Sequence, residues 1–287
     1  MPAATTHVEF AKDVYLHLPA PLQKQITDLP MFLVGSQGPD LLFFSGFSVL
    51  PSSMQWIGGK MHDEKIYEVI QYFDEHAVID DALRSYFYGY LCHYALDANV
   101  HPLVYCYSQK EAKQTGRNET EIHFRIEGEY DVHVLKAKGR SWKEYNVYES
   151  LKLSDNDVQK LAILYEGMLK KVFSISVTRT KLMRGIRDVS LMTRLLKPSK
   201  LKYATVNFIE NTLHAPKLVS GMMLSDKKQE TALNANHLPW SPVFDGSIVY
   251  YDSFDDLYAK ASDFAIKIIT NHDETDFTRT FCGEPVK

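Results

Sequence analysis

The sequence predicts an all-α fold in which a single mainly helical domain, residues 1–287, surrounds a long buried central helix. Residues 79–100 carry this prediction: they are apolar nearly all round, and a helix with so little polar surface belongs inside a protein. Side chains that cap helices precede several other periodic segments. Alternation of apolar and polar residues is scarce, so few strands are expected.

The expected central helix also carries polar residues that need an explanation. His93 and Asp97 lie among apolar residues such as Tyr90. Burying a charge without a partner is costly, so both side chains require a partner. Proline disfavours helix for the residue before it, and His101 precedes Pro102. We therefore expect the helix to end near His101.

Capping residues place the other helices. Thr6 is expected to cap the first helix, and Asn118 with Glu121 three residues later forms a capping box. Ser154 and Ser253 are similar starts. The expected helices span residues 6–17, 62–76, 79–100, 118–138, 154–173, 177–196, 200–213 and 255–270.

Two segments rich in glycine and proline, residues 28–59 and 215–252, are expected to be irregular. Within the single domain, the portion over about 1–140 holds the candidate functional residues described below. The portion over about 150–287 holds further helices and the second irregular segment.

Composition limits the class of protein. The chain has 32 Lys and Arg against 36 Asp and Glu, a net charge of −4, which gives no electrostatic footprint for duplex nucleic acid. Three cysteines are a sparse, odd number, as is typical of a reducing compartment. The amino terminus lacks the basic and apolar regions of a signal peptide, and no apolar run is long enough for a transmembrane segment. A cytoplasmic location is therefore expected.

Two expected helices each carry a histidine and a carboxylate four residues apart: His93 with Asp97, and His123 with Glu127. Residues at this spacing lie one turn apart on one helix face, so both can reach a single point. Imidazole nitrogen and carboxylate oxygen suit zinc and similar divalent ions. One such pair alone is more often a surface ion pair. Two pairs in one chain, with His101 four residues after Asp97, favour a metal site.

The order of these residues resembles that of the zinc-dependent phospholipase C family, which shares its all-α fold with the P1/S1-type nucleases. The family pattern is a His near the N-terminus, an Asp in a Pro-Asp turn, a His that opens a helix, a His-xxx-Asp pair, a further His and a His-xxx-Glu pair. The matching residues, in the same order, are His7, Asp40, His62, His93 with Asp97, His101, and His123 with Glu127. The resemblance spans residues 7–130 and points to an intracellular-looking bacterial branch of the family.

The resemblance implies a site with two or three Zn²⁺ ions. The implied ligand sets are Asp40, His62, His93 and Asp97 for one ion, His101, His123 and Glu127 for a second, and His7 with a bridging Asp97 for a third. Secreted relatives complete the third set with a processed N-terminus, whereas this sequence begins Met1-Pro2. Nitrogen and oxygen donors also suit iron, manganese or nickel.

Closely spaced divalent ions activate water and clamp a phosphate, so the first hypothesis is a metal-dependent hydrolase of a phospholipid or small phosphodiester. Asp40 is the candidate catalytic group that accepts a proton from the attacking water. Arg125 and Lys65 lie near expected ligands and either meet the phosphate or form surface charges. A P1/S1-like nuclease and a non-catalytic metal-binding homologue are the alternatives. No oligomeric state is predicted.

Overall fold

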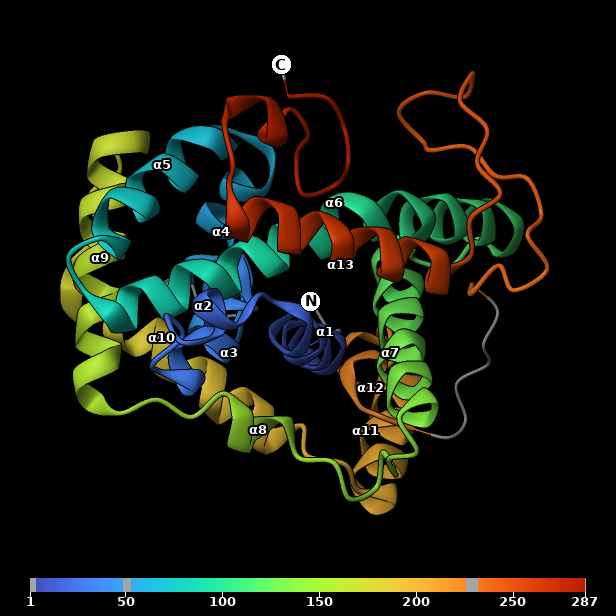
Figure 1. The fold of residues 1–287 in the computed structure, drawn as a ribbon. Coiled ribbons are helices and arrows are strands. Elements are labelled where there is room, and N and C mark those ends of the chain that lie inside the picture. Colours follow the sequence, from blue (N-terminus) through green and yellow to red (C-terminus); the bar gives the residue numbers. More distant parts are fainter. Residues whose placement is uncertain (1–3, 49–52, 226–231, 287) are drawn as a thin grey trace.

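The computed structural model describes residues 4–48, 53–225 and 232–286, and helices dominate it (Figure 1). Over those ranges there is no β-strand, and pairing is limited to two isolated antiparallel bridges, Trp240 with Tyr250 and Arg279 with Pro285. The all-α prediction is therefore confirmed. The helices are α1 (Ala4–His17), α2 (Ala20–Gln23), α3 (Leu29–Gly35), α4 (Gln55–Asp63), α5 (Ile66–Ala77), α6 (Asp81–Thr115), α7 (Glu119–Ala137), α8 (Val147–Ser150), α9 (Asp155–Phe173), α10 (Arg179–Leu195), α11 (Lys200–Thr212), α12 (Leu218–Met222) and α13 (Phe254–Thr270).

The central helix α6 has 35 residues and packs against α1, α3, α5, α7 and α13 (Figure 1). It begins where the Asp80 carboxylate accepts hydrogen bonds from the backbone N–H groups of Ala82 and Leu83. It ends at Gly116, whose φ of 71° favours glycine. The predicted buried central helix is thus confirmed.

The prediction that α6 ends near His101 is wrong, because the helix continues through Pro102 to Thr115. Proline lacks the N–H that would bond the carbonyl four residues earlier, here that of Ala98. Arg279 donates a hydrogen bond from Nη1 to this carbonyl at 3.3 Å. A distant part of the chain therefore supplies a hydrogen bond at the carbonyl that the proline leaves free, which local sequence rules do not reveal.

The prediction that residues 28–59 are irregular is also wrong. Asp28 caps α3 by accepting from the Met31 N–H at 3.0 Å, and two 3₁₀ turns follow, η1 (Gly38–Leu42) and η2 (Ser45–Ser48). Helix α4 then ends with His62 in its last turn, so His62 does not open a helix. Lys65, with a φ of 56°, separates α4 from α5.

Other helix starts follow the predicted caps, with one exception. Asn118, Ser154 and Ser253 each accept a hydrogen bond from the first turn of α7, α9 and α13. Thr6 is not a cap, because α1 already includes Ala4. The irregular segment 215–252 contains only the short helix α12 and one bridge among its described residues. Across the described part of the chain, no helix combines the length and apolarity needed to cross a membrane.

Candidate metal centre

The eight predicted ligand residues come together at α6. They arrive from α1, η1, α4, α6 and α7, and they form three groups whose ligand atoms lie within 4.8 Å of one another. We call the first two groups, which share one histidine, the buried cluster: His7, Asp40, His62, His93 and Asp97. We call the third group the rim cluster: His101, His123 and Glu127.

Asp97 lies between the clusters. Its Oδ1 is 3.3 Å from Nε2 of His7, and its Oδ2 is 3.1 Å from Nε2 of His93 and 3.7 Å from Nδ1 of His101. Burial raises the pKa of this carboxyl group, but the charges of the surrounding imidazoles lower it more, so the pKa lies well below its usual value. Asp97 is therefore ionised and can ligate or bridge ions.

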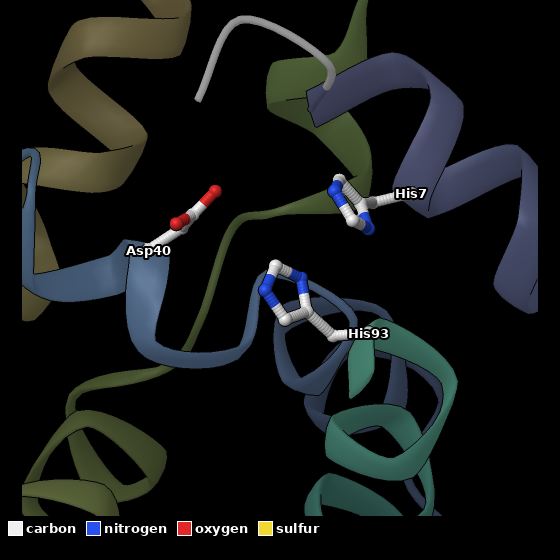
Figure 2. Close-up of side chains that lie close together, drawn as sticks. All are labelled: His7, Asp40 and His93. Atoms are coloured by element: carbon white, nitrogen blue, oxygen red, sulfur yellow. The ribbon is translucent and has the colours of Figure 1, made fainter. Parts of the chain in front are cut away.

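Three side chains of the buried cluster reach into one space from different elements (Figure 2). The rings of His7 and His93 stack with centroids 4.3 Å apart, and the Asp40 carboxylate extends from η1. Asp40 Oδ1 also lies 3.2 Å from Nε2 of His62. A Cβ at Gly38, which has a φ of 51°, would lie 2.2 Å from the His93 ring, so glycine allows η1 to pack against this histidine.

Backbone carbonyls orient three of the histidines. A carbonyl only accepts hydrogen bonds, so the Nδ1 atom of each ring carries a proton, and in the neutral ring Nε2 has its lone pair available for a metal. The pairs are His62 with Gly58 (2.7 Å), His93 with Ser36 (3.0 Å) and His101 with Phe281 (3.0 Å).

Two ring nitrogens of the buried cluster test whether zinc fits. His7 Nδ1 and His93 Nε2 are buried and make no hydrogen bond within the described residues, although His93 Nε2 faces the Asp97 carboxylate. A buried polar atom without a partner is costly, and a bound cation satisfies both lone pairs. The donor set is nitrogen and oxygen throughout, which suits zinc. The residues therefore fit a divalent ion.

The rim cluster is more open. Nε2 of His101 and Nε2 of His123 lie 3.4 and 3.3 Å from Oε1 of Glu127. Burial raises the pKa of Glu127, but nearby positive charges, together with hydrogen bonds from His101 and His123, lower it well below its usual value. Burial lowers the pKa of His101, but the Asp97 charge and its other neighbours raise it well above its usual value. The pair of histidines therefore faces an ionised carboxylate.

Comparison with known proteins gives one match. The family model described as zinc-dependent phospholipase C matches residues 6–173, more than half of the chain. The chain belongs to this family. No curated protein and no solved structure matches it. The matched segment includes all eight residues of the two clusters.

One part of the site lies outside the segment that matches the zinc-dependent phospholipase C family. We call residues 279–283 the C-terminal clasp. The Phe281 N–H donates to the His62 carbonyl at 3.0 Å, and the Phe281 carbonyl accepts from His101 Nδ1. The Phe281 ring lies 5.5 Å from that of His93. The clasp thus joins the two clusters, and no motif in the sequence indicates it.

The clasp also brings a thiol to the rim. Cys282 Sγ lies 3.5 Å from the Tyr105 hydroxyl, and the Tyr105 ring lies 4.9 Å from that of His123. Cys92, by contrast, is fully buried in the core, where burial raises the pKa of its thiol.

Arg125 and Lys65, two cationic residues that lie near the ligands in the sequence, each contact another part of the protein. Arg125 pairs with Glu111 and Glu129, and Lys65 donates to the Val172 carbonyl at 2.7 Å. Because both side chains are occupied by these contacts, they favour a structural role over contact with a phosphate.

Thr6 and Asp131 hold the first turn of α1 in place beside His7. Asp131 Oδ1 accepts from the backbone N–H and from the hydroxyl of Thr6, both at 2.7 Å. Asp131 is therefore not a candidate ligand itself, but it fixes the helix that carries the candidate ligand His7.

Proposed function

We propose that this chain hydrolyses a phosphoester bond in a phospholipid or a small phosphodiester, with two or three zinc ions held by the buried and rim clusters. One observation carries the proposal: eight nitrogen and oxygen donors, drawn from five elements, converge on two neighbouring clusters that meet at Asp97. Bound at such a site, divalent ions acidify water and neutralise the charge of a phosphate.

The protein's own contribution is a rigid arrangement of charge. The backbone carbonyls fix the orientation of His62, His93 and His101. Asp97 and Glu127 bring negative charge that attracts cations into the interior. Phosphodiester hydrolysis requires positioning and charge neutralisation more than covalent chemistry, so such a preorganised cage is suited to it.

Asp40 is the proposed acceptor of the proton from the attacking water. Burial raises the pKa of Asp40, but the hydrogen bond with His62 and the charge of His93 lower it below its usual value. The carboxylate is therefore ionised at neutral pH, as a proton acceptor must be. Its place on η1, opposite His7 and His93, puts it across the cluster from the helical ligands (Figure 2).

A substrate panel tests the proposal on the zinc-loaded chain. Phosphatidylcholine, p-nitrophenyl phosphorylcholine, bis-p-nitrophenyl phosphate and single-stranded DNA separate a phospholipase C, a general phosphodiesterase and a nuclease. We expect turnover of at least one of the first three. Full zinc content without turnover of any member of the panel contradicts the proposal and favours a non-catalytic metal-binding protein.

A matched pair of histidine variants on α7 shows whether turnover belongs to the candidate site. His123→Gln removes a proposed ligand from the rim cluster, and we expect at least about a hundredfold loss of kcat/KM. His133→Gln is the control, because His133 pairs with Asp255 at 2.8 Å and lies outside both clusters. Equal activity of the two variants contradicts the site.

A further inference from the structure

Helix α11 stands out because it presents apolar side chains to solvent. All its residues are described, and Glu210 is the one that is buried. Leu201 and Phe208 are 78% and 69% exposed, and at seven residues apart they share one face of the helix. An isolated helix of this length is marginal in water. An exposed apolar face on such a helix indicates a binding surface.

Exposed apolar side chains also precede and follow α11 in the chain. Leu191 and Leu195, four residues apart in the last turns of α10, are 43% and 53% exposed, and Leu213, just after α11, is 70% exposed. We call this surface the α10–α11 face: Leu191, Leu195, Leu201, Phe208 and Leu213. In Figure 1, α11 lies at the lower edge of the molecule, away from α6.

The stretch of sequence that carries the α10–α11 face has an excess of positive charge. Residues 191–219 contain five Lys and Arg and a single acidic residue, Glu210, in a chain whose net charge is −4. Glu210 points inward, where Oε1 accepts from the Val219 N–H at 2.9 Å. Lys200 and Lys202 are exposed and lie about 100° to either side of Leu201 on the helix. The whole-chain balance conceals this local excess.

A pocket connects the α10–α11 face with the start of α1. Its lining includes Leu196, Lys197 and Pro198, which join α10 to α11, and Thr5, which lies two residues before His7. The remaining lining is mainly apolar and includes Phe44 and Met222. The pocket thus lies between the α10–α11 link and the first turn of α1, and its charged lining residues are Lys197 and Asp131.

We propose that the α10–α11 face docks the chain on bilayers that contain anionic lipids. Exposed Leu and Phe side chains enter the boundary between headgroups and acyl chains, while the flanking lysines meet anionic headgroups. A nucleic acid needs the lysines but not the aliphatic side chains, so the combination favours a bilayer. Delivery of lipid to the metal centre by this docking rests on the proposed function. The docking itself is independent of that function.

Vesicle co-sedimentation of the zinc-loaded chain tests the proposal. We expect the protein to pellet with phosphatidylcholine vesicles that contain a third phosphatidylglycerol, to bind pure phosphatidylcholine more weakly, and to dissociate in 0.5 M NaCl. Lys200→Gln with Lys202→Gln lowers affinity roughly fivefold per lysine. Leu201→Ser with Phe208→Ser lowers it at least about tenfold.

Val78→Ser with Ile79→Ser is the matched control. Both side chains are 77% exposed, and both lie between α5 and α6 rather than on the α10–α11 face. This variant should bind vesicles as the unmodified chain does. Circular dichroism of all variants shows that folding is unchanged, and hydrolysis of p-nitrophenyl phosphorylcholine, which needs no bilayer, should stay at the unmodified level.

Several outcomes overturn the docking proposal. These are absence of binding to anionic vesicles, equal loss in the control variant, or a dimer in solution that Leu201→Ser with Phe208→Ser converts to a monomer without any vesicle binding. Binding of single-stranded DNA in place of vesicles also overturns it. A chain that docks but hydrolyses nothing keeps the docking surface and loses the proposed function, so the two failures are distinguishable.

Discussion

The buried cluster and the rim cluster meet at Asp97 but are held in different ways. In the buried cluster all the side chains are at most 10% exposed, and four separate elements supply the ligands. In the rim cluster the side chains of His101 and His123 are 13% and 12% exposed. Its ligands come from the neighbouring helices α6 and α7 alone.

This difference indicates that the buried cluster depends on more of the fold than the rim cluster does. The buried cluster forms only when α1, η1, α4 and α6 are all in place, so its geometry is tied to the whole fold. The rim cluster needs two packed helices and one outside contact, from the Phe281 carbonyl to His101. Ions in the rim cluster should therefore exchange more readily than ions in the buried cluster, which solvent reaches less.

Asp97→Asn should have the largest effect, because this carboxylate contacts histidines of both clusters. The neutral amide loses the charge that holds the cations, so we expect loss of at least one zinc per chain and at least about a thousandfold lower kcat/KM. Metal analysis and turnover measure both effects. Asp63→Asn, at an exposed carboxylate next to His62, is the control. Full zinc and full activity in Asp97→Asn exclude the assignment of both clusters.

Glu127→Gln should separate the clusters. The change removes the charge that faces His101 and His123. Glu127 belongs to no candidate group of the buried cluster. We expect zinc to fall by one ion per chain, with activity about a hundredfold lower. Glu119→Gln, also on α7 but in neither cluster, should keep full zinc content. Loss of every ion from Glu127→Gln contradicts the independence of the buried cluster.

Acidification should empty the rim cluster first. The pKa of His101 is raised well above its usual 6.5, because the Asp97 charge outweighs burial, so a proton competes with zinc as the pH falls through this raised value. In the buried cluster, burial lowers the pKa of His93, and that ring stays neutral at lower pH. His62 has a raised pKa, but less strongly so.

Zinc content measured from pH 8 down to pH 5 by native mass spectrometry should therefore show a first loss of one ion and later losses of the remainder. Glu127→Gln provides the control, because its first loss should be absent. Simultaneous release of all ions from the unmodified chain contradicts the contrast between the clusters.

The features that depend on residues close together in the sequence could be predicted. Helix periodicity and caps located α7, α9 and α13, and the spacing of His93 with Asp97 and of His123 with Glu127 places each pair on one helix face. These relationships act within one or two turns, so the sequence displays them directly. The order of the matching residues then indicated the family.

Contacts between segments that are far apart in the sequence could not be predicted in this way. Pro102 predicts a helix end only if no other group bonds the Ala98 carbonyl, and Arg279 does so from the other end of the chain. Phe281 reaches His62 and His101 through backbone atoms, which leave no trace in residue type. Gly283 allows the clasp to pack closely against Pro102, and it resembles any turn glycine in the sequence.

Gly283→Ala should have the smallest effect and tests whether the clasp holds the rim cluster. Gly283 has a φ of 79°, and an added Cβ would lie 2.5 Å from Cγ of Pro102. We expect the free energy of unfolding to fall by about 1–3 kcal/mol, because the left-handed backbone and the contact both disfavour alanine. Displacing the Phe281 carbonyl also frees His101 to rotate, so the zinc affinity of the rim cluster should fall roughly tenfold.

Gly246→Ala is the matched control, because a Cβ there meets nothing within 4 Å. Thermal unfolding measures stability, and the visible spectrum of the cobalt-substituted protein reports the geometry of the ions, which a general loss of stability does not alter. A changed cobalt spectrum in Gly283→Ala, with an unchanged one in Gly246→Ala, supports a positioning role. If Gly283→Ala is less stable but has the spectrum and metal affinity of the unmodified protein, the clasp stabilises the fold without orienting His101, and the rim cluster depends on α6 and α7 alone.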